Sequence, residues 1–110
     1  MSTDAEIQSE ALVLLSRQFG PEPDDEERPS AARLSMEEVR RYVVQQVSRL
    51  LNENPALLMS ILYRVDVAET DVQNVLAYTR PSDIPAELAD LLIHRQIQKI
   101  KIRRTYRGKE

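Results

Sequence analysis

Two consecutive apolar stripes, separated by Val65-Asp66-Val67, constrain the fold of this 110-residue chain more than any other feature. The apolar side chains before the break are Leu57, Leu58, Ile61, Leu62 and Val65, and those after it include Ala68, Val72, Val75 and Leu76. Because steps of three and four residues place side chains on one face of an α-helix, the pattern predicts two helices, near residues 55–64 and 67–79. The two helices are expected to meet at a corner.

Asp66 is predicted to cap the second of these helices. Its carboxylate is a good acceptor for the free backbone N–H groups of a first turn, and Glu69 lies three residues further on, as in a capping box. Asn54-Pro55 has the form of a cap followed by a first-turn proline, which predicts the start of the first helix of the corner.

Three further helices are predicted, near residues 3–19, 36–53 and 83–106. Thr3 and Ser35 each precede a glutamate by three residues, which is a helix-start signal. The last segment includes Ile100-Lys101-Ile102-Arg103, whose alternation is also typical of a short strand. Helix is favoured there because the apolar pattern continues without a break. The expected fold class is therefore an all-α domain of five helices.

The chain divides into two parts. Residues 1–34 are predicted to form an amphipathic N-terminal helix followed by an acidic linker, because residues 20–34 hold three prolines and almost no large apolar side chains. Residues 35–110 are predicted to form the helical core domain, with a basic C-terminal helix.

The compact part of the chain, Ser35 to Tyr106, has only 72 residues and buries little surface by itself. Its wide apolar stripes therefore predict a homo-oligomer, most simply a two-fold dimer. The candidate interface residues are Leu12, Leu15, Val43, Val47, Ile97 and Ile100.

Composition argues against several kinds of chemistry. There is no cysteine, so disulfides, thiolate nucleophiles and the usual structural zinc sites are excluded, and the two glycines do not make a phosphate-binding loop. His94 is the only histidine, which favours a surface or interface role over metal binding. We expect no catalytic residues, no metal and no cofactor, and so not an enzyme. With no signal peptide or apolar membrane span recognised, the expected location is the cytoplasm.

The corner resembles a helix-turn-helix motif, because Val67, Glu69, Val72 and Leu76 fall in register with the usual pattern. Three positions depart from it: Leu62 stands where a small residue is usual, Asp66 where the turn glycine is usual, and Ala68 where a capping serine is usual. The resemblance implies DNA reading by residues 68–75. That helix carries two carboxylates and no Lys or Arg, so a packed helical corner is the favoured interpretation.

Charge is distributed unevenly along the chain. Residues 1–38 carry ten acids and three bases (net −7), residues 39–90 are net −2, and residues 91–110 carry one acid and seven bases (net +6). The basic side chains of the last helix that are candidate anion or nucleic-acid contacts are Arg95, Lys99, Lys101, Arg103, Arg104 and Arg107. The other interpretation is that these basic side chains form a helix end that is solvated or paired with acidic residues. The overall negative charge of the chain favours this second interpretation. One further expectation is that the acidic residues 24–27 compete with nucleic acid for this basic helix.

The segments LYRVDV and LADLLIHRQIQKIK resemble short all-helical bacterial proteins of unknown function, over about residues 50–106. The resemblance implies a bacterial protein and no particular activity. From the residues themselves we predict a non-catalytic protein-protein interaction or adaptor module that acts as a homo-oligomer. The alternative is a nucleic-acid-binding protein that uses the basic last helix; no membrane partner is expected.

Overall fold

A computed structural model describes residues 4–19 and 35–107, and these residues are almost entirely helical. The helices are α1 (Asp4–Gln18), α2 (Met36–Glu53), α3 (Pro55–Val65), α4 (Glu69–Tyr78) and α5 (Ile84–Arg107), and a 3₁₀ turn, η3 (Pro81–Asp83), precedes the last of them. Within the described residues there is no strand, so the predicted all-α class and its five helices are confirmed. The Ile100–Arg103 segment is helical.

Local capping explains where α2 and α3 begin. The Ser35 hydroxyl accepts a hydrogen bond from the Glu38 backbone N–H at 3.2 Å, and the Asn54 side chain accepts one from the Leu57 N–H at 3.2 Å. Pro55 occupies the first turn of α3, where its missing N–H costs nothing. Both predicted starts are confirmed. The Thr3 capping box and the linker, residues 20–34, lie outside the described residues.

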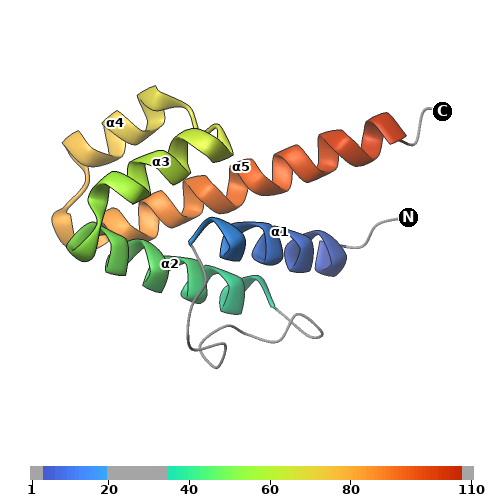
Figure 1. Cartoon of the computed structure of the whole chain (residues 1–110), viewed down its shortest axis with the longest axis horizontal. Coiled ribbons are helices and arrows are strands. Elements are labelled where there is room, and N and C mark those ends of the chain that lie inside the picture. Colours follow the sequence, from blue (N-terminus) through green and yellow to red (C-terminus); the bar gives the residue numbers. More distant parts are fainter. Residues whose placement is uncertain (1–3, 20–34, 108–110) are drawn as a thin grey trace.

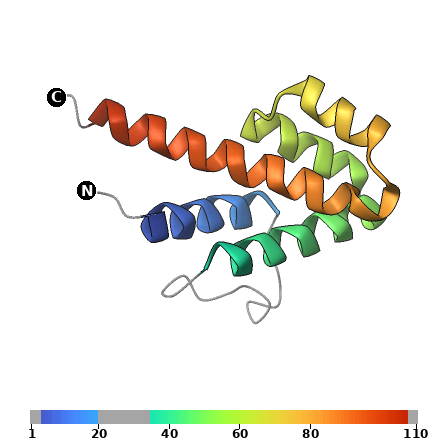
Figure 2. The same ribbon diagram turned by 180° about the vertical axis from the view of Figure 1, so that it is seen from behind.

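Helix α5 runs through the middle of the fold and contacts all four other α-helices. Figure 1 and Figure 2 show α1 and α2 along one side of α5, with α3 and α4 along the other. Its buried side chains include Leu88, Ala89, Leu92 and Ile93, which belong to the main core cluster. Because neighbours cover more than one face of α5, its apolar residues spread around the helix and do not form a single stripe.

Helix α1 packs on the second half of α5 and completes the core within one chain. Leu12, Leu15 and Phe19 belong to the main core cluster, and Ile7 and Ala11 form a second cluster with Ile100. The ring of Phe19 meets that of Tyr42 on α2 edge to face, with 6.2 Å between ring centroids. The small size of residues 35–106 is therefore no longer an argument for oligomerisation, because α1 supplies the missing apolar surface.

Five of the six candidate interface residues lie in this interior. Leu12, Leu15, Val43, Val47 and Ile100 are 0–1% exposed, and Ile97 is half-buried against both clusters. In this arrangement the first five have no surface to present to a second copy, because the chain's own helices cover them. The apolar stripes are packing surfaces, and the helices that cover them belong to the same chain.

The interior position of α1 predicts the effect of substitutions on its core face. Leu15→Ala should lower the free energy of unfolding by about 2–5 kcal/mol, because it removes buried methyl groups and leaves a cavity. Met59→Ala, at a position 48% exposed on α3, should change it by less than about 0.5 kcal/mol. Urea unfolding followed by circular dichroism measures both values. Equal, small effects of the two substitutions would show that α1 does not pack on the core in this way.

Candidate functional site

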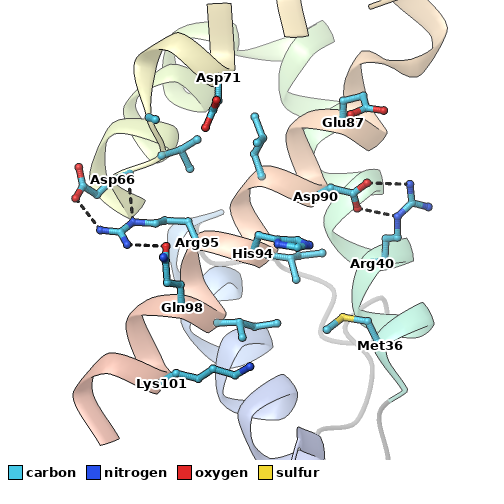
Figure 3. A pocket seen from close by; sticks show the side chains of 15 residues that line it. Met36, Arg40, Asp66, Asp71, Glu87, Asp90, His94, Arg95, Gln98 and Lys101 are labelled. Carbon is cyan, nitrogen blue, oxygen red and sulfur yellow. Dashed lines mark hydrogen bonds and ion pairs between the residues drawn. The ribbon is translucent and has the colours of Figure 1, made fainter. Parts of the chain in front are cut away.

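A groove of about 1180 Å³ follows the exposed face of α5. Figure 3 shows α5 as its floor, the N-terminal half of α2 on one flank and the α3–α4 corner on the other. The lining residues are Met36 and Arg40 from α2; Asp66, Val67, Ala68 and Asp71 from the corner and α4; and Glu87, Asp90, Leu91, Ile93, His94, Arg95, Ile97, Gln98 and Lys101 from α5.

The groove combines an apolar floor with charged ends. Leu91, Ile97 and Met36 are half-buried: each packs against the core and also lines the groove. In Figure 3, Asp71 and Glu87 lie toward one end of the groove and Lys101 lies at the other. Such a surface suits the apolar and charged side chains of a protein segment.

Arg40 and Asp90 join the α2 flank to the floor. The Arg40 Nε donates to Asp90 Oδ1 at 2.8 Å and Nη2 donates to Oδ2 at 3.3 Å, a two-point contact that fixes the guanidinium plane. The hydrogen bond to Asp90, followed by the attraction of its charge, raises the pKa of Arg40 above its ordinary value. Arg40 therefore stays charged at any physiological pH.

The other flank is held by Arg95, which reaches from α5 to the α3–α4 corner. Its Nε donates to the Asp66 backbone carbonyl at 3.0 Å, and its Nη2 donates to the Asp66 carboxylate at 3.0 Å. Nη1 also donates to the Gln98 side chain at 2.9 Å. The guanidinium thus ties the corner to the floor.

The predicted N-cap role of Asp66 is wrong. Asp66 ends α3 in the left-handed conformation, with φ 69° and ψ 42°, and α4 begins after Ala68 with no side-chain cap. The Val67 N–H bonds to the Leu62 carbonyl and the Asp66 N–H bonds to the Tyr63 carbonyl, the pattern of a Schellman motif. Asp tolerates this conformation better than most non-glycine residues, so it replaces the glycine usual at such a position.

The corner presents an acidic surface. Glu69 and Asp71 are exposed in the first turn of α4, and the Gln73 amide donates to the Glu69 carboxylate at 3.3 Å. Negative charge here repels phosphate, so the geometry favours the packed-corner interpretation over DNA reading.

Three of the six candidate nucleic-acid contacts make intramolecular contacts. Arg95 bonds to Asp66, Lys99 donates to the Val65 carbonyl at 3.4 Å, and Arg104 bonds to Glu10 at 2.7 Å. Lys101 and Arg103 are exposed, and the side chain of Arg107 lies outside the described part. The basic helix is thus partly neutralised by its own chain.

His94 lies in the middle of the groove floor and is exposed. No group of three or more His, Cys, Asp or Glu residues suited to a metal ion occurs among the described residues. Sequence reasoning did not single out Met36, Leu91 or Asp90 as site residues. Their half-buried positions follow from how α2 packs on α5, and no local pattern indicates it.

The left-handed backbone conformation of Asp66 can be tested by substitution at this position. Asp66→Asn should lower the free energy of unfolding by less than about 1 kcal/mol, because asparagine tolerates the turn and only an exposed ion pair is lost. Asp66→Val should lower it by about 1–3 kcal/mol more, because a β-branched residue is strained at positive φ. Urea unfolding of both variants measures the difference; identical losses would refute the left-handed turn.

Comparison of the chain with protein-family models, with curated proteins and with solved structures gave no match. No helix among residues 4–19 and 35–107 combines the length and apolar character needed to cross a membrane. The functional conclusion therefore rests on the groove and the contacts that shape it.

Proposed function

We propose that this chain is a non-catalytic protein-protein interaction module whose binding surface is the groove over α5. The observation that supports it is the half-buried apolar surface of Leu91 and Ile97 on the floor and Met36 on the α2 flank, with charged side chains at both ends. The absence of cysteine fits a reducing compartment, so the proposal includes a cytoplasmic location, in a bacterium if the resemblance to short bacterial proteins holds.

The shape of the groove suits a helical partner segment. The floor residues from Glu87 to Lys101 span 14 residue steps, or about 21 Å along α5. That length accommodates about four turns of an amphipathic helix laid along α5, with its apolar face on Leu91 and Ile97. The Arg40–Asp90 and Arg95–Asp66 contacts hold both flanks in place before binding, which lowers the entropic cost of capture.

Nucleic-acid binding is the weaker alternative. Its strongest support was the +6 charge of residues 91–110, and Arg95, Lys99 and Arg104 of that group contact their own chain. Among the candidate contacts with described side chains, Lys101 and Arg103 remain exposed for phosphates. Two cations supply little of the counterion release that nucleic-acid binding depends on.

Affinity capture from native extract tests the proposal. The tagged wild-type chain should retain specific proteins, and a His94→Arg/Gln98→Arg variant should retain at least about fivefold less of them, because a loss of about 1 kcal/mol already has that effect. Both positions are exposed, so the substitutions change the groove and spare the core. Mass spectrometry after nuclease treatment gives the measurement.

The matched control is Gln73→Arg/Asn74→Arg, which adds the same charge on exposed positions of α4 outside the groove. It should retain partners as well as the wild type does. Equal retention by the groove variant would contradict the proposal, and so would capture that nuclease abolishes.

The nucleic-acid-binding alternative can be tested separately. At about 50 mM salt, the full chain should not shift a DNA or RNA probe in an electrophoretic assay, because the exposed cations are few and the chain is net negative. A clear shift that Lys101→Glu/Arg103→Glu abolishes would favour the nucleic-acid function.

A further inference from the structure

The groove floor on α5 has a pattern that is symmetric about His94. Leu91 lies three residues before His94 and Ile97 three residues after it; Glu87 lies seven before and Lys101 seven after. All four line the groove together with His94. Seven residues are about two helical turns, so Glu87, His94 and Lys101 lie nearly in line on one face of α5.

A pattern of this kind is self-complementary when a second copy of α5 packs along it in the antiparallel direction. In an antiparallel pair centred on His94, each residue before His94 faces the residue at the same spacing after His94 in the other copy. Leu91 then meets the partner's Ile97, and Glu87 meets the partner's Lys101. A parallel pair would instead place like charges opposite one another, which is unfavourable.

The charges at the two ends of the groove are available for such a contact. Among the described residues, neither Glu87 nor Lys101 has an ion pair within 4 Å, and both are exposed. The other nearby charges differ: Asp90 is bound to Arg40, and Arg95 to Asp66. The charge of Glu87 also acts on the nearby Arg40 guanidinium. Neither end charge is held in a close ion pair, so both can contact a partner, whereas the flank charges are paired within the chain.

We propose that the groove binds a second copy of this chain, with the two α5 helices antiparallel about a two-fold axis at His94. This inference rests on the proposed interaction function and names its partner. The axis runs across the groove, so it carries the α3–α4 corner of one copy to the Lys101 end of the other. Figure 3 shows Asp71 of that corner at the Glu87 end, so the rotation brings an acidic group toward a basic one.

The contact is small. It extends over about 21 Å of α5 from each copy, so the dimer belongs near the lower end of specific interfaces. We therefore expect reversible association that depends on protein concentration. This dimer shares only Ile97 with the interface predicted from sequence, because it uses the exposed face of α5 and leaves the other five candidates in the core.

Cysteine cross-linking tests the axis directly, because the chain has no native cysteine. Helices packed about 8–10 Å apart bring facing Cα atoms within the range of a disulfide. Under mild oxidation, His94→Cys should form a covalent dimer at least about tenfold faster than Tyr63→Cys. Tyr63 is a strict control because it is 86% exposed on α3, outside the groove, and so is open to random collision. Equal rates would overturn the proposed axis.

Exchanging the charges at positions 87 and 101 tests whether Glu87 of one copy pairs with Lys101 of the other. Glu87→Lys or Lys101→Glu should each raise the dissociation constant by about 5- to 30-fold, measured by sedimentation velocity, because two attractive contacts become repulsive. The double variant keeps the net charge and should restore the dissociation constant to near its original value. Mixing the two single variants should produce a heterodimer. Circular dichroism of each variant verifies that it is folded.

Failure of this inference is distinguishable from failure of the proposed function. A mass of 12.7 kDa at every concentration up to about 1 mM would overturn the dimer. If groove-dependent capture of other proteins persisted in that case, the interaction function would stand with a different partner. A dimer that ignores the charge exchange and does not cross-link through position 94 would also overturn the proposal.

Discussion

Helix α5 contacts each of the other four α-helices. The positions of these helices depend on the packing of their apolar side chains against α5. Leu88 and Leu92 lie in the main core with α2 and α3, whereas Ile100 lies further along, against Ile7 and Ala11 of α1. Burial of such side chains is worth about 1.5–3 kcal/mol each. One continuous helix therefore serves as the shared wall of two apolar clusters, and its remaining exposed face becomes the floor of the groove.

Part of the charge asymmetry of the chain is neutralised by ion pairs within the molecule. Arg104, near the end of α5, pairs with Glu6 at 3.7 Å and with Glu10 at 2.7 Å on α1. An attraction between the acidic beginning and the basic end of the chain thus occurs through α1. The expectation concerned residues 24–27, which lie outside the described part. Exposed pairs add little stability, but they favour the antiparallel placement of α1 over the reverse.

The parts of the fold that depend on nearby residues were predictable, and those that depend on distant ones were not. Ser35 and Asn54 could be identified as caps because a cap involves only the next three residues. The local sequence around Asp66 is compatible with either an N-cap or a left-handed turn. In the structure Asp66 adopts the left-handed turn and accepts a hydrogen bond from Arg95 of α5. The groove was not predictable, because Met36 and Leu91 share it only after α2 has packed on α5.

Under the proposed function, the groove residues divide into those that serve folding and those that would contact a partner. Leu91 and Ile97 pack on the core with their inner sides, so substitutions there change stability and recognition together. His94, Gln98 and Lys101 are exposed and line the same groove, so substitutions there change recognition with little effect on stability. Because the exposed residues carry the charge and the half-buried residues carry the apolar surface, specificity for a partner is able to vary without loss of the fold.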